Sequence, residues 1–280
     1  MKTLYITDLD GTFLTDEARV SPASARLVTE LSHAGALISV ATARTPATVE
    51  PIMADTYTAA DMVVMTGAGL WNRPRHAFDS LRLLPPHEVA AITEAMRTGG
   101  ISLFGYAAHP ADGHLHVYHP APALSEAERI FVGLRRNLAL KTFHLAQSIP
   151  EADYDRTVLF FGMGSEARIT AFAEELRRLT SCYVSYYKDT YLPDNWLIEI
   201  FAHGVSKAAG ISQLKQHLQA DRIVAFGDNL NDIPMLRSAD LAVAVGNALP
   251  ETKEAADIVI GDNNSDSVAR FIADDYARTL

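Results

Sequence analysis

Short apolar runs alternate with helical stretches near both ends of the chain, and this order constrains the fold more than any other feature. The runs 4–6, 37–40 and 62–65 are apolar, and amphipathic segments separate them, the first opening with Ser21 and Pro22. A Ser followed by Pro is typical of a helix start. Apolar strands separated by helices are typical of a parallel sheet covered on both faces. We therefore predict an α/β fold with a doubly wound, Rossmann-like parallel sheet.

The middle of the chain follows another pattern. Helices are expected at 86–98, 125–136 and 166–179, and strands at 101–106, 114–118, 157–161 and 183–187. Paired strands between helices favour a largely antiparallel α+β module. Apolar runs at 197–200, 223–226, 241–245 and 258–260 then return to the first pattern. We predict a core made of residues 1–83 and 189–280, interrupted by an inserted α+β module at 84–188.

The chain is acidic, with a formal net charge of −10 over 280 residues. Proteins that bind nucleic acid usually carry a basic surface, so this charge argues against such a partner. No apolar run reaches the about 18 residues of a membrane helix, and the first residues do not have the form of a signal peptide. The single cysteine, Cys182, cannot form an internal disulfide, which fits a reducing cytoplasm. We expect a cytoplasmic protein that binds neither nucleic acid nor membrane, with the oligomeric state open between monomer and dimer.

Two carboxylates, Asp8 and Asp10, directly follow the first predicted strand in the sequence Asp-Leu-Asp-Gly-Thr. Carboxylates a few Å apart repel each other unless a cation lies between them or one binds a proton. Asp8 could then stay ionised as a metal-assisted nucleophile, and Asp10 could act as general acid and base. An acidic turn that caps the next segment is the alternative that this pentapeptide leaves open.

A second acidic loop, Gly-Asp-Asn-Leu-Asn-Asp at 227–232, follows another apolar strand. Mg²⁺ prefers oxygen ligands and usually keeps waters beside one or two carboxylates. Asp8 and Asp228, at the carboxyl ends of two parallel strands, would meet at such a site. Asn231 and Asp232 begin the following helix, where capping is the simple interpretation. For Asp232, support of the metal ligands is an equal alternative.

Two smaller elements could complete a phosphate site. Thr42, Ala43 and Arg44 follow the second strand, where the Thr hydroxyl and backbone N–H groups could donate to a phosphoryl oxygen. Lys207 opens a later helix and could offset negative charge there. A single Thr or Lys in such a place is usually a turn or a solvated surface residue. Since all these elements follow strands of one predicted parallel sheet, one crevice at its carboxyl edge explains them together.

These motifs, in this order, resemble the haloacid dehalogenase superfamily, specifically the Cof-type phosphatases of subclass IIB. The similarity covers both core segments and rests on the Asp8–Thr12 motif, Thr42, Lys207 and the 227–232 loop, with further likeness in 242–248, 255–257 and 263–266. The resemblance implies a magnesium-dependent phosphatase whose cap domain, at 84–188, sets substrate specificity.

The resemblance also assigns roles to individual residues. It implies that Asp8 is the nucleophile and a Mg²⁺ ligand, and that Asp10 is the acid and base and binds the metal through its backbone carbonyl. Asp228 would be the third metal contact. Thr42 and Lys207 would hold the phosphoryl group, with Ala43 beside Thr42. Arg44 would lie near the phosphate, and an ion pair at the surface is an equal alternative for it. Asn231 would touch phosphate or hold Lys207, with Asp232 behind it.

Three positions depart from the family pattern. Ala43 and Ser267 each stand where Gly is common, and Thr66 stands where Asn is common. None of these changes removes a reacting group. We therefore expect them to affect loop shape and substrate fit rather than the chemistry.

Four histidines of the inserted module, His109, His114, His116 and His119, lie close together in the sequence. His114 and His116 should share one strand face, where they could contact a polar substrate. A zinc site is a weaker alternative, because no cysteine is near, and hairpin polarity explains the cluster equally well.

The leading functional hypothesis is hydrolysis of a small phosphorylated metabolite, such as a sugar phosphate, through a phosphoaspartate on Asp8. Two alternatives share the same reacting groups. A phosphomannomutase-like phosphotransferase would pass the phosphoryl group to a sugar instead of water. A non-enzymatic, receiver-like signalling domain would hold its phosphoaspartate, but the spacing of Asp8 and Asp10, the 227–232 loop and the inserted module argue against it.

Overall fold

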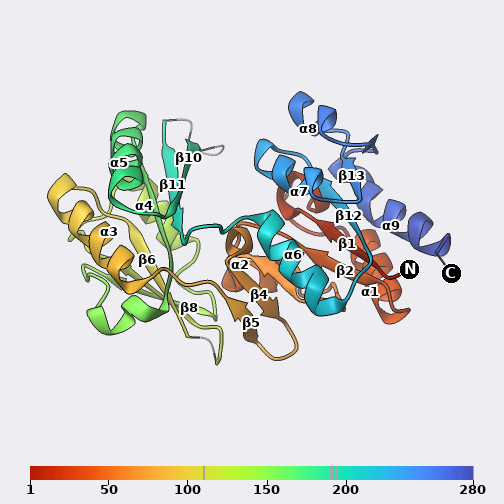
Figure 1. Cartoon of the computed structure of the whole chain (residues 1–280), viewed down its shortest axis with the longest axis horizontal. Helices are drawn as coiled ribbons and strands as arrows, with labels where there is room; N and C mark the ends of the chain where they lie inside the picture. The colour runs from red at the N-terminus through yellow and green to blue at the C-terminus, as the bar shows by residue number, and fades with distance from the viewer. Residues whose placement is uncertain (110, 190–191, 193, 280) are drawn as a thin grey trace. The chain divides into compact units, whose positions relative to one another are not determined.

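The computed structural model describes residues 1–109, 111–189, 192 and 194–279. The chain divides into two compact units (Figure 1). The first unit combines Met1–Ser80 with Ser206–Leu280, and the second comprises Leu81–Val205. The second unit is therefore an insertion in the sequence of the first. Among the described residues, no helix combines the length and apolar character needed to cross a membrane.

A five-stranded parallel sheet forms the centre of the first unit. Its strand order is β14-β13-β12-β1-β2. The strands are β1 (Thr3–Thr7), β2 (Leu37–Val40), β12 (Arg222–Gly227), β13 (Leu241–Ala244) and β14 (Ile258–Val259). From β1 the chain first adds β2 on one side and later β12 on the other. The carboxyl ends of β1 and β12 thus border the switch point where ligands bind in such sheets.

Helices cover both faces of this sheet. They are α1 (Pro22–His33), α2 (Pro46–Ile52), α6 (Lys207–Leu218), α7 (Ile233–Arg237), α8 (Pro250–Glu254) and α9 (Ser267–Ala277). Successive strand residues point to opposite faces. Leu4 and Ile6 of β1 join a buried cluster with residues of α6 and α7, among them Ile211, Leu214, Met235 and Leu236. On the other face, Tyr5 donates to Asp275 of α9 over 2.9 Å. The α/β prediction is confirmed.

The expected third strand of the parallel series starts a separate small sheet. Strand β3 (Met62–Val64) pairs antiparallel with β4 (Gly69–Asn72), and β5 (Ala77–Leu81) follows in the same sheet. Among the described residues, an isolated parallel bridge between Ala41 and Val63 links it to the main series. The strands β4 and β5 were not predicted, because β5 carries no buried residue and so shows no apolar run.

The second unit is built on a six-stranded sheet of order β10-β11-β9-β6-β7-β8. The strands are β6 (Phe104–Ala108), β7 (Leu115–His119), β8 (Lys141–Leu145), β9 (Thr157–Gly164), β10 (Tyr183–Lys188) and β11 (Trp196–Phe201). All described pairs are antiparallel except β7 with β8. The largely antiparallel character was predicted. Strand β8 was missed, because its polar and apolar residues alternate at the sheet edge.

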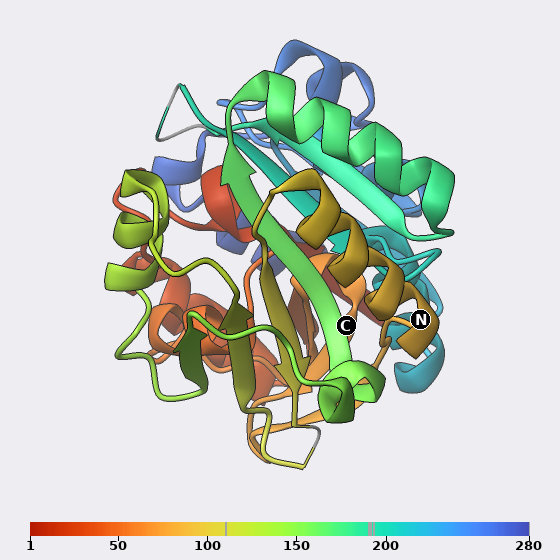
Figure 2. The same ribbon diagram turned by 90° about the vertical axis from the view of Figure 1, so that its left-hand side faces the viewer.

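Three helices pack on this sheet. Helices α3 (Pro86–Gly99) and α5 (Glu166–Leu179) lie side by side on one face (Figure 2). Helix α4 (Glu126–Gly133) packs on the opposite face, where Phe131 stacks 5.0 Å from Phe161 and lies 5.2 Å from Phe104. Helix α4 begins at Ser125, whose side chain accepts from Glu128 while Glu128 accepts in return. The predicted capping box is therefore confirmed.

One strand was assigned to the wrong sheet. Residues 197–200 were expected in the parallel core, but β11 lies between β10 and β9 in the second unit. The units accordingly change at 81 and at 205/206, rather than at 84 and 188. An apolar run such as Leu-Ile-Glu-Ile fits either sheet, because it does not indicate whether the neighbouring strands run parallel or antiparallel to it.

Candidate active site

Asp8 and Asp228 follow neighbouring parallel strands. Thr7, the last residue of β1, is in register with Phe226 of β12. The backbone N–H of Asp8 donates to the carbonyl of Phe226 over 3.0 Å, which ties the start of the first acidic loop to the second strand. The structure thus places both carboxylates at the carboxyl edge of the sheet, where the sequence predicted them.

A buried lysine joins the two acidic loops. The ammonium of Lys207 donates to Asp8 and to Asp232 over 2.7 Å each. Lys207 is 4% exposed, Asp8 is 5% exposed and Asp232 is fully buried. Its position follows from α6, whose N-cap Ser206 accepts from Ala209 over 3.1 Å and so places Lys207 first in the helix. The ammonium between the two carboxylates offsets the repulsion between Asp8 and Asp232.

Burial and charge shift the ionisation of these groups. Desolvation raises the pKa of Asp8 to about 8, with a smaller contribution from the negative charge of Asp232, while Lys207 acts in the opposite direction. Burial likewise raises the pKa of Asp228 to about 6. The pKa of Lys207 lies above its ordinary value because its two carboxylate neighbours outweigh its own desolvation. Lys207 is therefore charged at neutral pH, and a further cation near Asp8 and Asp228 would favour their ionised forms.

The Asp228 carboxylate is held by the first acidic loop. Thr12 is buried and donates its hydroxyl to Asp228 over 2.7 Å. Gly11 has a φ of +75°, and a Cβ on it would lie 2.5 Å from the second oxygen of Asp228. Glycine is thus required here both for the left-handed backbone and for the close approach of the carboxylate.

Asp232, rather than Asn231, holds Lys207. Besides Lys207, Asp232 accepts from the backbone N–H groups of Asp228 and Asn229 over 3.1 Å each. Asp232 therefore caps the loop and supports the ion pair at once, which combines the two roles that the sequence left equal. The side chain of Asn231 is exposed. Of the two roles predicted for Asn231, Asp232 fills the one of holding Lys207. Contact of Asn231 with phosphate stays a prediction.

Asp10 and Arg44 form a bidentate ion pair. The guanidinium of Arg44 donates to the two oxygens of Asp10 over 2.7 and 2.5 Å. The Arg44 backbone N–H also donates to the hydroxyl of Thr42 over 3.1 Å, and Thr42 is buried. Ala43, which stands between Thr42 and Arg44, is exposed.

The donor set suits a hard divalent cation. Oxygens of Asp8, Asp228 and Asp232 lie within 4.8 Å of one another. Asp232 is already engaged by Lys207 and two N–H groups. Asp8 and Asp228 each use one oxygen in the described hydrogen bonds, so a second oxygen of each remains for a cation. Two carboxylates with space for water match what Mg²⁺ requires.

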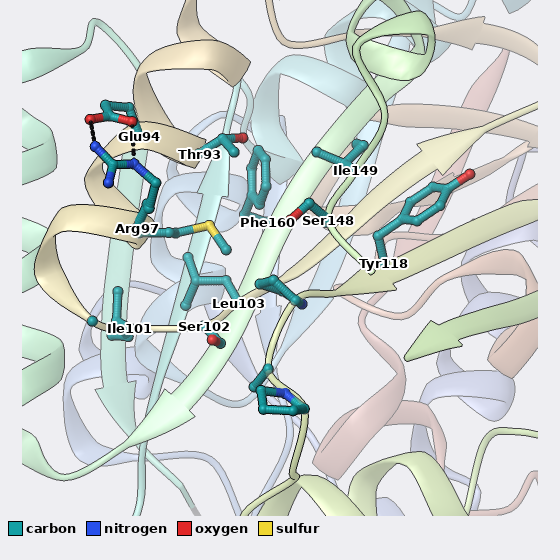
Figure 3. Close-up of a pocket in the computed structure, with 16 residues that line it drawn as sticks. Thr93, Glu94, Arg97, Ile101, Ser102, Leu103, Tyr118, Ser148, Ile149 and Phe160 are labelled. Carbon is teal, nitrogen blue, oxygen red and sulfur yellow. Dashed lines mark hydrogen bonds and ion pairs between the residues drawn. The ribbon is translucent and has the colours of Figure 1, made fainter. Parts of the chain in front are cut away.

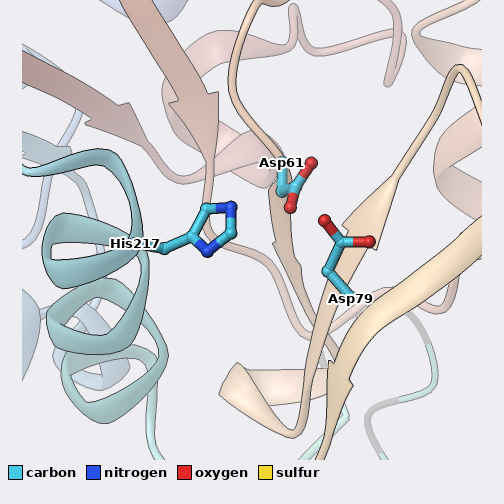
Figure 4. Close-up of side chains that lie close together, drawn as sticks. All are labelled: Asp61, Asp79 and His217. Carbon is cyan, nitrogen blue, oxygen red and sulfur yellow. The ribbon is translucent and has the colours of Figure 1, made fainter.

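A second group of potential metal ligands in the first unit has fewer carboxylate oxygens left for a cation. Asp61, Asp79 and His217 also approach within 4.8 Å (Figure 4). Asp79 is ion-paired with Arg75, and Asn72 donates to Asp61 over 2.9 Å and to Asp79 over 3.4 Å. Both oxygens of Asp79 and one oxygen of Asp61 are thus engaged, so this group leaves fewer carboxylate oxygens for a cation than Asp8 and Asp228 do.

Several supporting residues were not predicted. Asn247 donates to the carbonyl of Gly11 over 2.7 Å, and its own carbonyl accepts from Asn263 over 3.0 Å. Thr12 holds Asp228, as described above. An amide that bonds to backbone has no strong sequence signal, although Asn263 and the 242–248 stretch both belong to the motif that carried the family resemblance.

The departures from the family pattern lie in strained turns. Thr66 has a φ of +57° and Asp266, next to Ser267, has the same value. Asn is common in left-handed backbone and a β-branched residue is rare there, which explains the preference for Asn at position 66. A Cβ on Gly67 would lie 2.1 Å from the carbonyl oxygen of Ser206, so this turn packs directly against the start of α6.

The histidines of the second unit do not form one group. His114 and His116 share a face of β7, where His114 bonds to Thr142 over 2.8 Å and His116 to His144 over 2.9 Å. His119 lies buried on the other face and bonds to Glu128 over 3.1 Å. His109 pairs with Asp112 over 3.2 Å. His144 was not predicted to join the cluster because the strand that carries it was missed.

A cavity of about 360 Å³ lies within the second unit, between α3 and the sheet face that α3 covers (Figure 3). Its polar lining includes hydroxyls of Thr93, Ser102 and Ser148. Glu94 and Arg97 at its wall are paired with each other over 2.5 Å. The lining holds no lysine and no pair of unengaged carboxylates, so it offers no reacting group like those around Asp8.

Comparison with known proteins agrees with the geometry of the acidic site. A model of the haloacid dehalogenase-like hydrolases matches residues 5–272. The chain belongs to this family. The matched range includes the residues that the fold assembles at the carboxyl edge of the parallel sheet.

Full-length relatives are phosphatases. The chain is 24% identical over 273 residues to the 5-amino-6-(5-phospho-D-ribitylamino)uracil phosphatase YcsE of Bacillus subtilis, covering 96% of this chain and 94% of that protein. It is 25% identical to the pyridoxal phosphate phosphatase YbhA of Escherichia coli, with 95% of each chain covered. The solved structure of the subclass IIB sugar phosphatase BT4131 matches with a TM-score of 0.70 at 22% identity, covering 99% of both chains. The chain is thus a phosphatase of the Cof type, as predicted.

Proposed function

We propose that the chain is a Mg²⁺-dependent phosphomonoesterase that hydrolyses a small phosphorylated metabolite through a phosphoaspartate on Asp8. The observation that carries the proposal is the pair of carboxylates, Asp8 and Asp228, each with an oxygen left over beside the buried ammonium of Lys207. Such a cluster binds a cation and a phosphate dianion together, which explains how an acidic protein can hold an anionic substrate.

Asp8 supplies the nucleophile in this proposal. One carboxylate oxygen of Asp8 attacks phosphorus, a bond from that oxygen to phosphorus forms, and the ester P–O bond breaks, while the other oxygen would hold the cation. Lys207 has three N–H donors and uses two on Asp8 and Asp232, so one remains for a phosphoryl oxygen. Bound Mg²⁺, held by Asp8, Asp228 and the backbone carbonyl of Asp10, would neutralise the phosphoryl charge.

Asp10 exchanges protons in both steps. It gives a proton to the leaving oxygen and then takes one from the water that attacks the phosphoaspartate. Since Arg44 holds both oxygens of Asp10, one of the two contacts must open before a proton can pass. Arg44 thus positions Asp10 in this proposal, in addition to the predicted contact with phosphate, and Thr42 presents its hydroxyl to the phosphoryl group.

The substrate class is proposed from the relatives. YcsE, YbhA and BT4131 are named for a phosphoribityl compound, for pyridoxal phosphate and for sugar phosphates. Each of these is a small phosphorylated metabolite, and a sugar phosphate or a similar compound is the substrate we propose here. The second unit, with its sheet and three helices, would supply the contacts that select it. A cytoplasmic location fits such substrates.

The decisive experiment replaces the nucleophile. Asp8→Asn should abolish hydrolysis of p-nitrophenyl phosphate while the protein stays folded, and Asp55→Asn, which changes an exposed acid of the same unit, should have no effect. Chelation should stop the native enzyme and Mg²⁺ should restore it. Acid-quenched peptide mass spectrometry should find the phosphoryl group on Asp8. Near-normal activity of Asp8→Asn would refute the mechanism, and phosphate release without a bisphosphate activator would exclude a phosphotransferase.

A further inference from the structure

The loop that follows β13 contacts both acidic loops of the candidate active site. This loop, residues 245–249, leaves the parallel sheet at its carboxyl edge. The side chain of Asn247 donates to the carbonyl of Gly11 over 2.7 Å, and the backbone N–H of Leu249 donates to the carbonyl of Asp228 over 2.9 Å. One short segment therefore joins the first acidic loop to the second.

The 245–249 loop is packed tightly from behind. The backbone N–H of Gly246 donates to the carbonyl of Gly261 over 3.0 Å. A Cβ on Gly246 would lie 3.1 Å from the backbone nitrogen of Asp262, which is closer than an ordinary contact. Ala248 is 5% exposed. The loop therefore has little room to shift away from the two acidic loops.

Both ends of the Asn247 amide are engaged, although the residue is exposed. Its NH₂ group donates to the carbonyl of Gly11, and its own carbonyl accepts from the backbone N–H of Asn263 over 3.0 Å. Asn263 is 6% exposed and donates in turn to the carbonyl of Leu14 over 2.9 Å. Since a backbone N–H can only donate, Asn263 determines which end of the amide faces Gly11.

The turn that Asn247 contacts has an irregular backbone. Its closing hydrogen bond runs from the N–H of Leu14 to the carbonyl of Leu9 over 2.8 Å, one residue further than in an α-helix. Inside the turn, Asp10 and Gly11 depart from helical dihedral angles. The carbonyl of Gly11 thus lies outside a regular ladder of backbone bonds, and the Asn247 side chain takes the place of a backbone donor.

The contact with Gly11 bears on the Asp228 carboxylate. A peptide unit is planar, so a bond to the carbonyl of Gly11 also orients the backbone nitrogen of Thr12. Thr12 is 1% exposed and donates its hydroxyl to one oxygen of Asp228 over 2.7 Å. A Cβ on Gly11 would lie 2.5 Å from the other oxygen, so Gly11 also faces this carboxylate closely. The two residues that share this peptide therefore define where the carboxylate lies.

We propose that Asn247 is a positioning residue, which holds the Gly11–Thr12 peptide so that Asp228 keeps the place it needs to bind a divalent cation. The inference rests on the proposed function, because the cation belongs to that proposal. Asn247 acts through Thr12 and Gly11 and takes no part in the bond changes at phosphorus. Its removal should therefore appear first as weaker binding of the cation.

Binding of Mn²⁺, a paramagnetic substitute for Mg²⁺, can be followed on the full chain by electron paramagnetic resonance without any turnover. Asp228→Asn should remove the tight binding and so identifies the signal from this site. Asn247→Ala should raise the Kd for Mn²⁺ about tenfold, since groups that orient metal ligands typically change metal affinity by at least this factor. An unchanged Kd in folded Asn247→Ala would overturn the proposal.

Asn264→Ala is the matched control. This exposed amide also donates once and accepts once, but both bonds, of 3.1 Å each, go to Asp16 beyond the first acidic loop. The control should leave the Kd for Mn²⁺ unchanged, and thermal unfolding should show that both variants are folded. An equal rise of the Kd in Asn264→Ala and Asn247→Ala would mean that any loss of local bonding weakens the site, and it would overturn the specific role of Asn247.

A double-mutant cycle tests the route through Thr12. Thr12→Val keeps the branched shape of the buried side chain and removes the hydroxyl that holds Asp228. If Asn247 acts through the Gly11–Thr12 peptide, the double variant should bind Mn²⁺ more tightly than the product of the two separate losses predicts. Losses that simply multiply would show that Asn247 acts independently of Thr12, against the proposal.

The same measurements separate this inference from the proposed function. A native protein that binds no Mn²⁺ would refute the metal-dependent phosphatase itself. A native protein that binds Mn²⁺ with the same Kd as Asn247→Ala would refute only the role of Asn247. In p-nitrophenyl phosphate hydrolysis, the Mg²⁺ concentration for half-maximal rate should rise in Asn247→Ala by the same factor as the Kd, whereas a smaller folded fraction would lower the rate at every Mg²⁺ concentration.

Discussion

Gly11→Ala tests the geometry of the acidic site most sharply. A Cβ at this position would lie 2.5 Å from an oxygen of Asp228, and ordinary contact begins near 3.4 Å, so the carboxylate must withdraw by about 0.9 Å. Metal ligands tolerate displacements of only about 0.2 Å. The apparent affinity for Mg²⁺ should therefore fall about 10- to 100-fold. The left-handed backbone, with φ at +75°, adds a stability cost of about 1–2 kcal/mol.

Gly35→Ala is the matched control in the same unit. Gly35 also has a positive φ, of +100°, but the nearest atom to a Cβ there is the hydroxyl of Tyr276 at 3.6 Å, an ordinary contact. Both variants should lower Tm by several degrees, since about 1 kcal/mol corresponds to roughly 2–4 °C in a domain of this size. Only Gly11→Ala should shift the Mg²⁺ dependence of p-nitrophenyl phosphate hydrolysis. Equal Mg²⁺ dependence in the two folded variants would refute the assigned role of Asp228.

Three further outcomes follow from the buried charges and the strained turn. Lys207→Met should abolish activity and cost about 3–5 kcal/mol, because Asp8 and Asp232 lose their cation. Since burial already raises the pKa of Asp8 to about 8, this variant should regain stability as pH falls below 8. Urea titrations at several pH values measure the free energy of unfolding, and a loss that does not depend on pH would contradict this expectation. Thr66→Asn should raise Tm by a few degrees, because Asn tolerates the φ of +57° better than a β-branched residue, and an unchanged or lower Tm would count against strain there. Burial lowers the pKa of Lys141 to about 7, so the unfolded chain binds more protons than the native protein above pH 7. The free energy of unfolding should therefore rise from pH 7 towards pH 10, and Lys141→Met should remove that rise. An equal pH dependence of the free energy of unfolding in both proteins would exclude this effect of Lys141.

The sequence predicted the position of the two acidic loops because parallel topology determines where they meet. Acidic loops that follow two strands of one parallel sheet must lie at the same edge, and the structure joins Asp8 and Asp228 there through adjacent strands. Lys207 could be placed for a similar reason, since Ser206 marks the start of its helix. These predictions needed only strand order and helix caps, which are local properties of the sequence.

Contacts between side chains from distant segments were not predictable in this way. Asp232 and Asn231 are neighbours, and only the turn of the backbone decides which one faces Lys207. The Asp10–Arg44 pair joins residues 34 positions apart, and nothing in either motif specifies it. Strand β11 was misplaced for the same reason, because an apolar run shows that a strand is buried but not which strands flank it.

The two buried lysines, Lys207 and Lys141, differ in whether carboxylates lie beside them. Both Lys207 and Lys141 are 4% exposed, yet Lys207 has two carboxylates at 2.7 Å and Lys141 has none among the described residues. Two anionic neighbours keep Lys207 charged whether or not a ligand is present, which suits a group that must stabilise a phosphoryl transfer at every turnover. Lys141 has no such neighbours within the described part of the chain, and burial lowers its pKa to about 7, so its amine is only partly charged at neutral pH.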